Sequence, residues 1–280
     1  MKCQACGKNI VLAGSKFCSE CGVKIEPLKP TPPRCETFTD IRKIKVGVGT
    51  EFKIMPSNTN ETTVTVDGPE EVKQGLTMKL QNGVLEINGP SDSVNISISN
   101  TGGQGTIIEG NIFIGHGIRN VFVAGNNTVI GNNTIGGNNP VSVTITTPYN
   151  VEVIIDTTGD VNCEVGEIGG EISIATDGDL TFNAVRLISF KAEVSGDLSV
   201  KIDQFEGEKC KIEVDGDCIL SIPSGHIEKL IIDVCGDVRL EVGAETVEAK
   251  IKIIGDLNGN LRAETARMNV VGLNTVRIIR

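Results

Sequence analysis

Aromatic side chains and long apolar runs are scarce in this 280-residue sequence. It contains no Trp, a single Tyr and eight Phe. No apolar run approaches the roughly 18 residues that a membrane-spanning helix needs. The N-terminus begins Met1-Lys2-Cys3-Gln4 and lacks the apolar stretch typical of a signal peptide. We therefore expect no membrane span and a cytoplasmic location.

Helix-forming stretches of any length are also missing, and so is a net positive charge. The 33 glycines and the many Val, Ile, Thr and Asn residues are typical of β structure, while an apolar content of 39% permits a real core. The formal net charge is -10, which argues against binding to a phosphate backbone. We expect an all-β protein and no nucleic-acid partner. Residues 1–50 differ from the rest, since nine Lys and Arg against four Asp and Glu give +5 there and leave -15 elsewhere.

A Gly-Asp pair returns six times at a spacing of 18 to 20 residues in the second half of the sequence. The pairs are Gly159-Asp160, Gly178-Asp179, Gly196-Asp197, Gly216-Asp217, Gly236-Asp237 and Gly255-Asp256. Apolar residues alternate on both sides of each pair, at two and four positions before the Gly and at two and six positions after it. This alternation predicts strand, turn, strand. A fixed period near twenty residues predicts a stack of similar coils, because one such unit cannot bury its apolar face alone.

Four cysteines near the N-terminus have the spacing of a zinc site. The sequence reads Cys3-x-x-Cys6-Gly7 and then Cys18-x-x-Cys21-Gly22, with eleven residues between Cys6 and Cys18. Two such turns place four sulfurs around one ion at about 2.3 Å. Disulfides between these cysteines are disfavoured because the sequence shows no secretion signal. A redox-active dithiol is disfavoured because no βαβ pattern surrounds the cysteines. The four thiolates predict one closed, structural Zn²⁺ that supplies the folding free energy of residues 1–25.

This stretch resembles the short zinc-ribbon domain common at the N-termini of bacterial and archaeal proteins. The resemblance covers about the first 25 residues and implies an interaction module with no fixed partner. Residues 26–35 follow, with Pro27, Pro30, Pro32 and Pro33 close together. That composition predicts a semi-extended linker between two independently folding parts. Cys35, just past the prolines, is interpreted as incidental.

Residues 36–280 are expected to form one β domain. Strands are predicted at 41–48, 51–55, 62–66 and 76–80, and Asn82-Gly83 before Val84-Leu85-Glu86-Ile87 predicts a tight hairpin. Val64-Thr65-Val66-Asp67, this hairpin, the run from Val141 to Pro148 and the Gly-Asp repeats together resemble the head GIN domain of "putative auto-transporter adhesins". The resemblance implies a parallel β-helix (β-solenoid) and provides no catalytic residues to carry over to this sequence. This sequence departs from that family in two respects: it has the zinc-ribbon head, and it carries an Asn/Gly-rich insertion at about 94–139.

The insertion carries a short repeat of its own. Gly-Asn-Asn recurs every six residues, at 125–127, 131–133 and 137–139, with apolar residues nearby. Asn suits turn positions because it tolerates the left-handed conformation. The period favours a further tight solenoid turn, and a low-complexity loop that grips a ligand is the alternative.

The six aspartates of the repeat invite two interpretations. Stacked about 4.8 Å apart, neighbouring carboxylates would repel by roughly 0.9 kcal/mol in water, and a weak Ca²⁺ stripe would relieve that repulsion. The calcium-binding nonapeptide signature is absent, however. The favoured interpretation is that each Gly adopts a left-handed conformation and each Asp accepts a neighbouring backbone N–H at an exposed corner.

No other residue pattern indicates catalysis. Cys163, Cys210 and Cys218 fall on the inward register and are expected in the core, whereas Cys235 falls outward. His116 and His226 are isolated in sequence. Ser224-Gly225-His226 lacks the strand-turn-helix setting of a nucleophile elbow.

Two classes of function remain after this reading. The first is a non-enzymatic binding or scaffold protein, with the zinc ribbon as interaction head for a protein partner and the solenoid as platform. The alternative is a β-helix enzyme acting on carbohydrate, which rests on fold analogy and suits a sequence with 3% aromatics poorly. The binding protein is preferred. The apolar C-terminal segment, residues 269–280, further predicts a homo-oligomer through the last coil, because no helix caps it.

Overall fold

The computed structural model describes residue 21 and residues 32–68, 70–89, 93–94, 112–113, 119–124, 127–134 and 141–280. The chain separates into two compact units, Met1–Pro32 and Pro33–Arg280. Cys3, Cys6 and Cys18 of the predicted zinc site lie outside the described residues, and Cys21 is exposed. Within these ranges, no helix has the length and apolar character that a membrane crossing requires.

The second unit is built almost entirely from strands, as predicted. Its first elements are β1 (Arg34–Thr39), β2 (Lys43–Gly47), β3 (Glu51–Pro56), β4 (Glu61–Asp67), α1 (Glu70–Gly75), β5 (Thr77–Gln81) and β6 (Val84–Asn88). The predicted strands here agree with β2 to β6 within two residues at each end. β1 was not predicted as a strand, and it begins inside the proline-rich stretch assigned to the linker.

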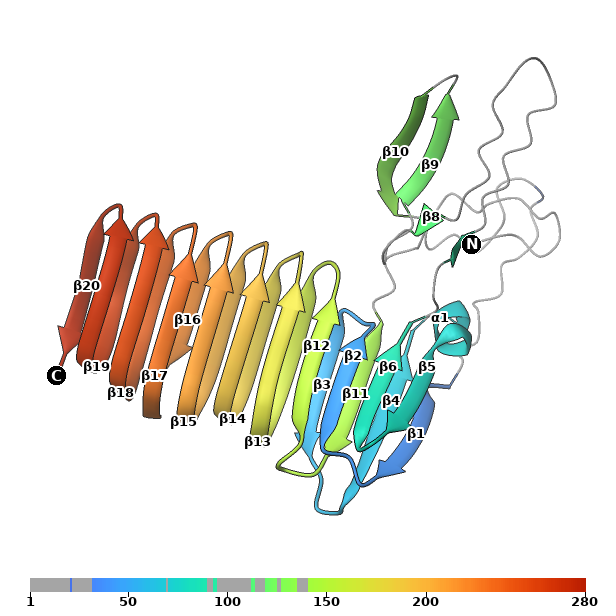
Figure 1. Cartoon of the computed structure of the whole chain (residues 1–280), viewed down its shortest axis with the longest axis horizontal. Coiled ribbons are helices and arrows are strands. Elements are labelled where there is room, and N and C mark those ends of the chain that lie inside the picture. The colour runs from blue at the N-terminus through green and yellow to red at the C-terminus, as the bar shows by residue number, and fades with distance from the viewer. Residues whose placement is uncertain are drawn as a thin grey trace. The chain divides into compact units, whose positions relative to one another are not determined.

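The remaining strands of the unit carry the repeat (Figure 1). They are β11 (Ser142–Thr147), β12 (Glu152–Thr157), β13 (Val161–Thr176), β14 (Leu180–Val194), β15 (Leu198–Val214), β16 (Cys218–Ile222), β17 (Gly225–Val234), β18 (Val238–Ile254), β19 (Leu257–Val271) and β20 (Asn274–Ile279). From β11 to β20 every pairing between successive coils is parallel. The predicted parallel β-solenoid is therefore confirmed.

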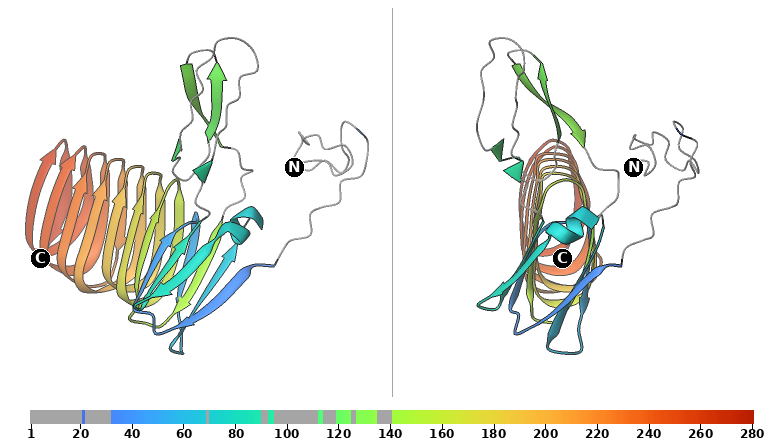
Figure 2. Two further views of the ribbon diagram at one scale, coloured as in Figure 1. Left: turned by 45° about the vertical axis from the view of Figure 1, so that its right-hand side comes forward. Right: turned by 90° about the vertical axis from the view of Figure 1, so that its right-hand side faces the viewer.

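Each coil has two flat faces, which the near end-on view shows as a flattened loop (Figure 2). The first face runs through β11, β3, the first halves of β13, β14 and β15, β16, the first halves of β18 and β19, and β20. The second face runs through β6, β2, β12, the second halves of β13, β14 and β15, β17, and the second halves of β18 and β19. A Gly-Asp pair stands at six of the corners where the chain passes from the second face to the first.

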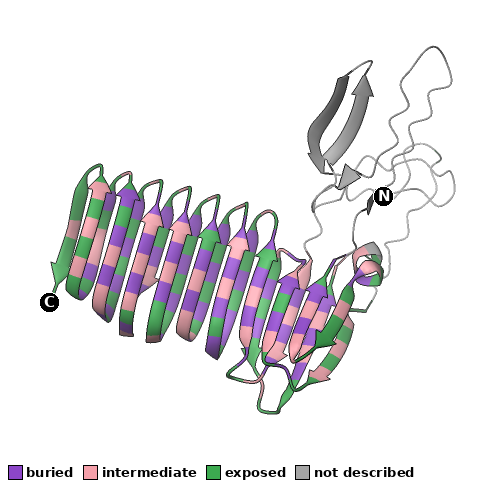
Figure 3. Cartoon of the chain, in the orientation of Figure 1, coloured by how far each residue is buried: buried purple, intermediate pink, exposed green. Residues whose placement is uncertain are grey.

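The core lies between the two faces, and its side chains follow the predicted alternation (Figure 3). All four apolar positions around each Gly-Asp pair are buried. The largest fully buried side chains include Phe182, Phe190 and Phe205, and the rings of Phe182 and Phe190 pack with centroids 4.4 Å apart. Inward residues recur at the same place in every coil, so each coil buries the apolar face of its neighbour.

Two early strands are inserted into the stack far from their own place in sequence. β3 pairs with β11 on one side and with β13 on the other. β2 pairs with β6 and with β12, and the Nζ of Lys43 lies 2.7 Å from Oε1 of Glu152 across that junction. Residues 43–56 thus complete a coil with residues more than 80 positions later.

Antiparallel strands close the N-terminal end of the solenoid. β4 pairs antiparallel with β11 and with β1, and β5 pairs antiparallel with β6 through the predicted Asn82-Gly83 turn. Asn82 and Gly83 have φ of 53° and 76°, as a tight hairpin requires.

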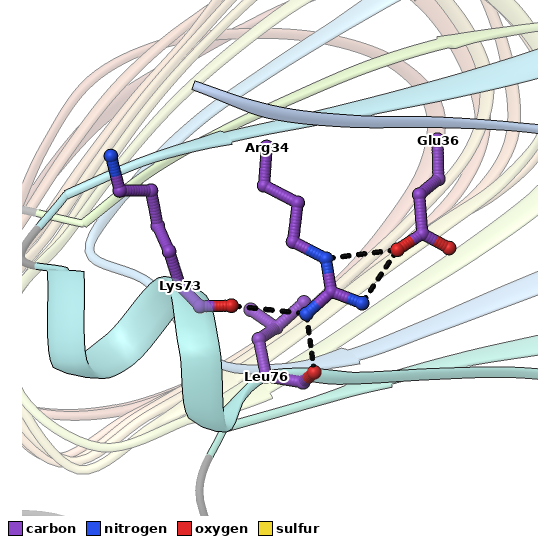
Figure 4. Close-up of polar contacts among 4 residues, drawn as sticks. All are labelled: Arg34, Glu36, Lys73 and Leu76. Carbon is purple, nitrogen blue, oxygen red and sulfur yellow. Dashed lines mark hydrogen bonds and ion pairs between the residues drawn. The ribbon is translucent and has the colours of Figure 1, made fainter. Parts of the chain in front are cut away.

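Arg34 fastens the short helix α1 to this closed end. Its Nη1 donates to the carbonyls of Lys73 (3.0 Å) and Leu76 (2.6 Å), and its Nε donates to Oε1 of Glu36 at 2.8 Å (Figure 4). Leu76 is buried and Val72 packs against the core. The helix therefore belongs to the closed end of the solenoid.

The described part of the insertion differs from the solenoid turn that its repeat favoured. β7 (Ser93–Val94) pairs antiparallel with β8 (Ile112–Phe113), and β9 (Arg119–Ala124) pairs antiparallel with β10 (Asn127–Thr134). The predicted further turn is wrong for these residues, because a solenoid turn would pair its strands in parallel. An Asn-rich stretch suits a hairpin turn as well as a coil corner.

Candidate functional site

The aspartates of the repeat form a hydrogen-bonded ladder along the exposed corner of the coils. Oδ1 of each Asp accepts the backbone N–H at the equivalent position of the next coil. The donor to Asp160 is Asp179 (3.1 Å), and the later rungs join Asp179 to Asp197, Asp197 to Asp217, Asp217 to Asp237, and Asp237 to Asp256 at 2.8 to 2.9 Å. The last rung joins Asp256 to the N–H of Leu273. The favoured interpretation, a carboxylate accepting a neighbouring N–H, is confirmed.

The glycines of the ladder have a different role from the one predicted. Only Gly159 and Gly255 of the six have φ in the positive range, at 84° and 151°. At Gly216, a Cβ atom would instead lie 2.6 Å from the carbonyl oxygen of Gly196 in the preceding coil, and Gly178, Gly196 and Gly236 are similarly crowded. The prediction that every Gly adopts a left-handed conformation is therefore wrong. Glycine is required because neighbouring backbones approach too closely for a side chain.

Substitution of one rung tests the ladder against the calcium stripe. Asp217→Asn keeps an acceptor oxygen and is expected to cost less than about 1 kcal/mol, while Asp217→Ala removes the acceptor and is expected to cost about 1 kcal/mol. Urea unfolding of the purified chain measures both. Added Ca²⁺ is expected to leave both midpoints unchanged. A calcium-dependent stabilisation that Asp217→Asn abolishes would establish the cation stripe instead.

The cysteines of the solenoid fall where their register predicts. Cys163, Cys210 and Cys218 are buried, and Cys235 is exposed. Burial raises the pKa of the Cys210 and Cys218 thiols to about 12 and raises that of Cys163 as well. These three thiols are neutral near pH 7 and pack as small apolar side chains.

The sequence candidates Ser224 and His226 are occupied by local contacts at a corner. The hydroxyl of Ser224 donates to the carbonyl of Asp203 at 2.7 Å, and the following Gly225 has φ of 111°. Nε2 of His226 lies 3.1 Å from Oε1 of Glu228. Among the described residues, no group of three or more His, Cys, Asp and Glu side chains is placed to hold a metal ion.

A long groove follows the second face beside the Gly-Asp corner. Its larger part has a volume of about 680 Å³ and crosses β12, β13, β14, β15, β17 and β18. Its lining residues are Asp156, Thr157, Thr158, Ala175, Thr176, Asp177, Glu193, Val194, Ser195, Glu213, Val214, Asp215, Asp233, Cys235 and Lys252. A second part of about 640 Å³ shares Asp156, Thr157 and Thr158 and extends over β2 and β6. We call the two parts together the corner groove.

The corner groove is long because it crosses eight neighbouring strands of one face. Strands in a sheet lie about 4.8 Å apart, so seven steps give a length of about 34 Å. No aromatic side chain and no histidine lines it. Thr157, Thr176, Val194 and Val214 form part of its lining and are themselves buried. The walls therefore belong to the rigid part of the fold.

Two charged rows run along the corner groove. The position three before each Gly forms an in-register row of Asp156, Ala175, Glu193, Glu213, Asp233 and Lys252. A second row, at the position five before each Gly, includes Lys191 and Lys211. Nζ of Lys191 lies 2.6 Å from Oε1 of Glu193, and Nζ of Lys211 lies 2.6 Å from Oε2 of Glu213. Nζ of Lys252 lies 3.0 Å from Oδ2 of Asp233.

These ion pairs leave the groove with more acidic than basic side chains. The hydrogen bond from Lys191 holds the pKa of Glu193 below its usual range, and the same bond raises the pKa of Lys191. Among the described residues, Asp156, Asp177 and Asp215 have no Lys or Arg nitrogen within ion-pair distance. The groove can therefore offer several ionised carboxylates to a ligand of opposite charge.

The corner groove was missed in the sequence, although its signal is present there. The aspartates of the Gly-Asp pairs stand one position after each Gly. The residues that line the larger part of the groove stand one to three positions before each Gly. Aligning the coils at the Gly shows acids at four of the six positions that precede it by three, namely Asp156, Glu193, Glu213 and Asp233. Whether such a row lies in a hollow or on a ridge depends on the corner geometry, which the repeat alone does not give.

Comparisons with known proteins add three solved structures of similar chain trace. No protein-family model and no curated protein matches the sequence. A "putative lipid binding protein" of Parabacteroides distasonis is 12% identical, with a TM-score of 0.46 over 89% of this chain and 97% of that one. A "putative adhesin" of the same organism is 12% identical, with a TM-score of 0.43 over 88% of this chain and 97% of that one. A "putative adhesin" of Bacteroides fragilis is 11% identical, with a TM-score of 0.36 over 90% of this chain and 100% of that one. At these identities and scores they do not bear on what this chain binds.

Proposed function

We propose that the protein is a non-enzymatic binding protein whose solenoid presents the corner groove to an extended segment of a protein partner. The observation that carries this proposal is the continuity of the groove across eight hydrogen-bonded strands. At about 3.3 Å per residue, a groove of about 34 Å accommodates roughly ten residues of extended chain. A rigid scaffold binds such a segment without losing its own conformational entropy.

The charges of the groove select the chemistry of that segment. Carboxylates at Asp156, Asp177 and Asp215 are exposed and free of Lys or Arg partners in the described part of the chain, so they favour Lys and Arg side chains on the ligand. The same charges oppose a nucleic-acid partner. Binding of this kind weakens as salt is added, because exposed charges are screened.

The carbohydrate enzyme is the weaker proposal. Hydrolysis of a glycosidic bond needs a carboxylic acid whose pKa is raised so that it can donate a proton. Glu193, in the middle of the groove, has its pKa lowered by Lys191. The lining also lacks aromatic side chains on which sugar rings could stack.

We further propose that residues 1–25 form a head that holds one structural Zn²⁺ through Cys3, Cys6, Cys18 and Cys21. Four thiolates are a complete tetrahedral ligand set, so the site leaves no position for a substrate. The head would add a second, separately folded interaction module. A reducing cytoplasm suits thiolates that must stay unoxidised, and we propose that location.

Zinc removal is expected to unfold the head and to leave the solenoid intact. Metal binding supplies the folding free energy of so short a segment, whereas the solenoid has its own core. Elemental analysis of protein purified without chelator is expected to give one zinc per chain, and Cys18→Ser is expected to lose it. The thermal midpoint of the solenoid is expected to be the same with and without zinc. A metal content well below one per chain would contradict the site.

Photocrosslinking tests the groove directly. A photoreactive residue placed at Asp156 or at Asp233 lies in the groove, and the same residue at Ile219 lies on the outer surface of the first face as a matched control. Asp156 and Asp233 are four strands apart, about 19 Å, which an extended ligand spans with about six residues.

The expected result is one partner protein captured from both groove positions, through sites about six residues apart in a single basic segment. Ile219 is expected to capture none of it. Capture of the same partner with equal yield at Ile219, or of unrelated proteins at the two groove positions, would contradict the proposal.

A further inference from the structure

The last coil of the solenoid leaves two strand edges without a partner in the described part of the chain. β20 ends the first face and pairs only with β19. The second half of β19 ends the second face and pairs only with β18. At the opposite end the described residues also leave edge strands, since β1 pairs only with β4 and β5 only with β6, but Arg34 holds α1 beside them. Unpaired edges of this kind are templates for a further strand.

The strands at these edges are largely exposed (Figure 3), and several of their exposed residues are apolar. Val271 and Leu273 are 65% and 64% exposed, and Ile254, which pairs with Val271 in register, is 53% exposed. Ile278 and Ile279 of β20 are also exposed, and Val276 packs against the core while remaining partly open. Such a patch is unusual on a surface that faces water permanently.

Leu273 limits what can pair with this end. The seventh corner reads Gly272-Leu273, and the N–H of Leu273 is the last donor to the aspartate ladder, 2.9 Å from Oδ1 of Asp256. Leu273 offers no carboxylate in return. A further parallel coil would therefore lack the hydrogen bond present at each earlier Asp corner, whereas an antiparallel strand does not require it.

We infer that this end of the solenoid, residues 263–279, pairs antiparallel with the same end of a second copy of the chain. The chain crosses the two faces of a coil in opposite directions. A two-fold rotation perpendicular to the stack therefore places an antiparallel strand against both edges at once. A second copy has two edges at the required spacing and direction, which a single strand from another protein does not.

The size and charge of the end predict a weak dimer. Each of the two end strands is about six residues, or about 20 Å, long, and each sheet takes up about 10 Å of width. The end therefore has an area of roughly 400 Å² per copy, about half of what each partner contributes to a standard interface. Residues 263–279 carry two arginines, Arg267 and Arg277, and one acid, Glu264, so this end has a net positive charge in both copies. Added salt screens that repulsion and is expected to strengthen the dimer, whereas it weakens binding in the corner groove.

Sedimentation equilibrium of the full zinc-loaded chain tests this inference. Between about 5 and 500 μM, the range suited to so small an interface, the mass is expected to rise from one chain, 29.7 kDa, towards two and to stop there. Val276→Lys and Leu273→Asp are expected to abolish and to weaken dimerisation, respectively. Ile219→Lys, which changes an exposed aliphatic residue away from the end, is expected to have no effect.

Hydrogen exchange of the β20 amides provides a second readout. It keeps the inference testable even if the Val276→Lys variant does not fold. Their exchange is expected to slow as the wild-type concentration rises, and Leu273→Asp, at an exposed position, is expected to shift that slowing to higher concentrations. Three results would overturn the inference: a single-chain mass throughout, a mass that continues to rise beyond two chains, or a dimer that neither substitution affects. Amides of β20 that are protected at every concentration would assign the edge to a segment of the same chain and would also overturn it.

Discussion

Leu220→Asp is expected to unfold the solenoid, whereas Ile219→Asp is expected to leave it folded. The two residues are neighbours in β16, but Leu220 is fully buried and Ile219 is 52% exposed. An aspartate at 220 would place an unpaired carboxylate between Val200 and Leu240 of the adjoining coils, at a cost of more than about 4 kcal/mol. Urea unfolding followed by circular dichroism measures both variants.

The paired design separates register from β propensity. Both substitutions put the same poor strand former into the same strand, so only the face of the sheet differs. Ile219→Asp is expected to cost less than about 1 kcal/mol. Equal destabilisation by the two variants would show that the alternation of β16 is not the one that the structure has.

Gly216→Ala is expected to destabilise the solenoid far more than Gly159→Ala. At Gly216 the added Cβ would lie 2.6 Å from the carbonyl oxygen of Gly196, so two backbones must move apart. We expect a loss of about 3 kcal/mol or more, because overpacking against backbone cannot be relieved by a rotamer change. At Gly159 no atom lies within 4 Å of the added Cβ, and only the positive φ of 84° opposes it, at about 1 kcal/mol.

Equilibrium unfolding of the two alanine variants measures this difference. The order of the two effects is the informative result, since the left-handed conformation alone would make Gly159 the more sensitive position. A larger loss at Gly159 than at Gly216 would contradict the close approach of neighbouring coils.

The repeat predicts most of the fold because its signal is local and occurs in every coil. Leu220, Val194 and Cys218 could be assigned to the core from their distance to the nearest Gly, since period-two alternation fixes which side chains share a face. The Asp ladder followed from the same spacing. The role of the glycines did not, because contact between backbones of successive coils has no separate trace in the residue pattern.

The arrangement of the first strands could not be predicted in the same way. β2 and β3 pair with strands that begin about 100 residues later, and the ion pair between Lys43 and Glu152 has no counterpart in a repeat. A strand pattern predicts which face is buried and leaves the partner strand open. The corner groove depends on that arrangement, because β2 and β6 extend it beyond the regular coils.

A charge reversal inside the groove tests the proposed function most directly. Asp215→Lys changes an exposed groove carboxylate that has no Lys or Arg partner among the described residues, and Glu241→Lys makes the same change on the first face, outside the groove. The measurement is the Kd of each full-length variant for the partner captured at Asp156 and Asp233, by titration at fixed salt. We expect Asp215→Lys to raise the Kd at least about tenfold, equivalent to about 1.4 kcal/mol, and Glu241→Lys to leave it unchanged. An unchanged Kd for Asp215→Lys, or an equal rise for both variants, would contradict binding in the corner groove.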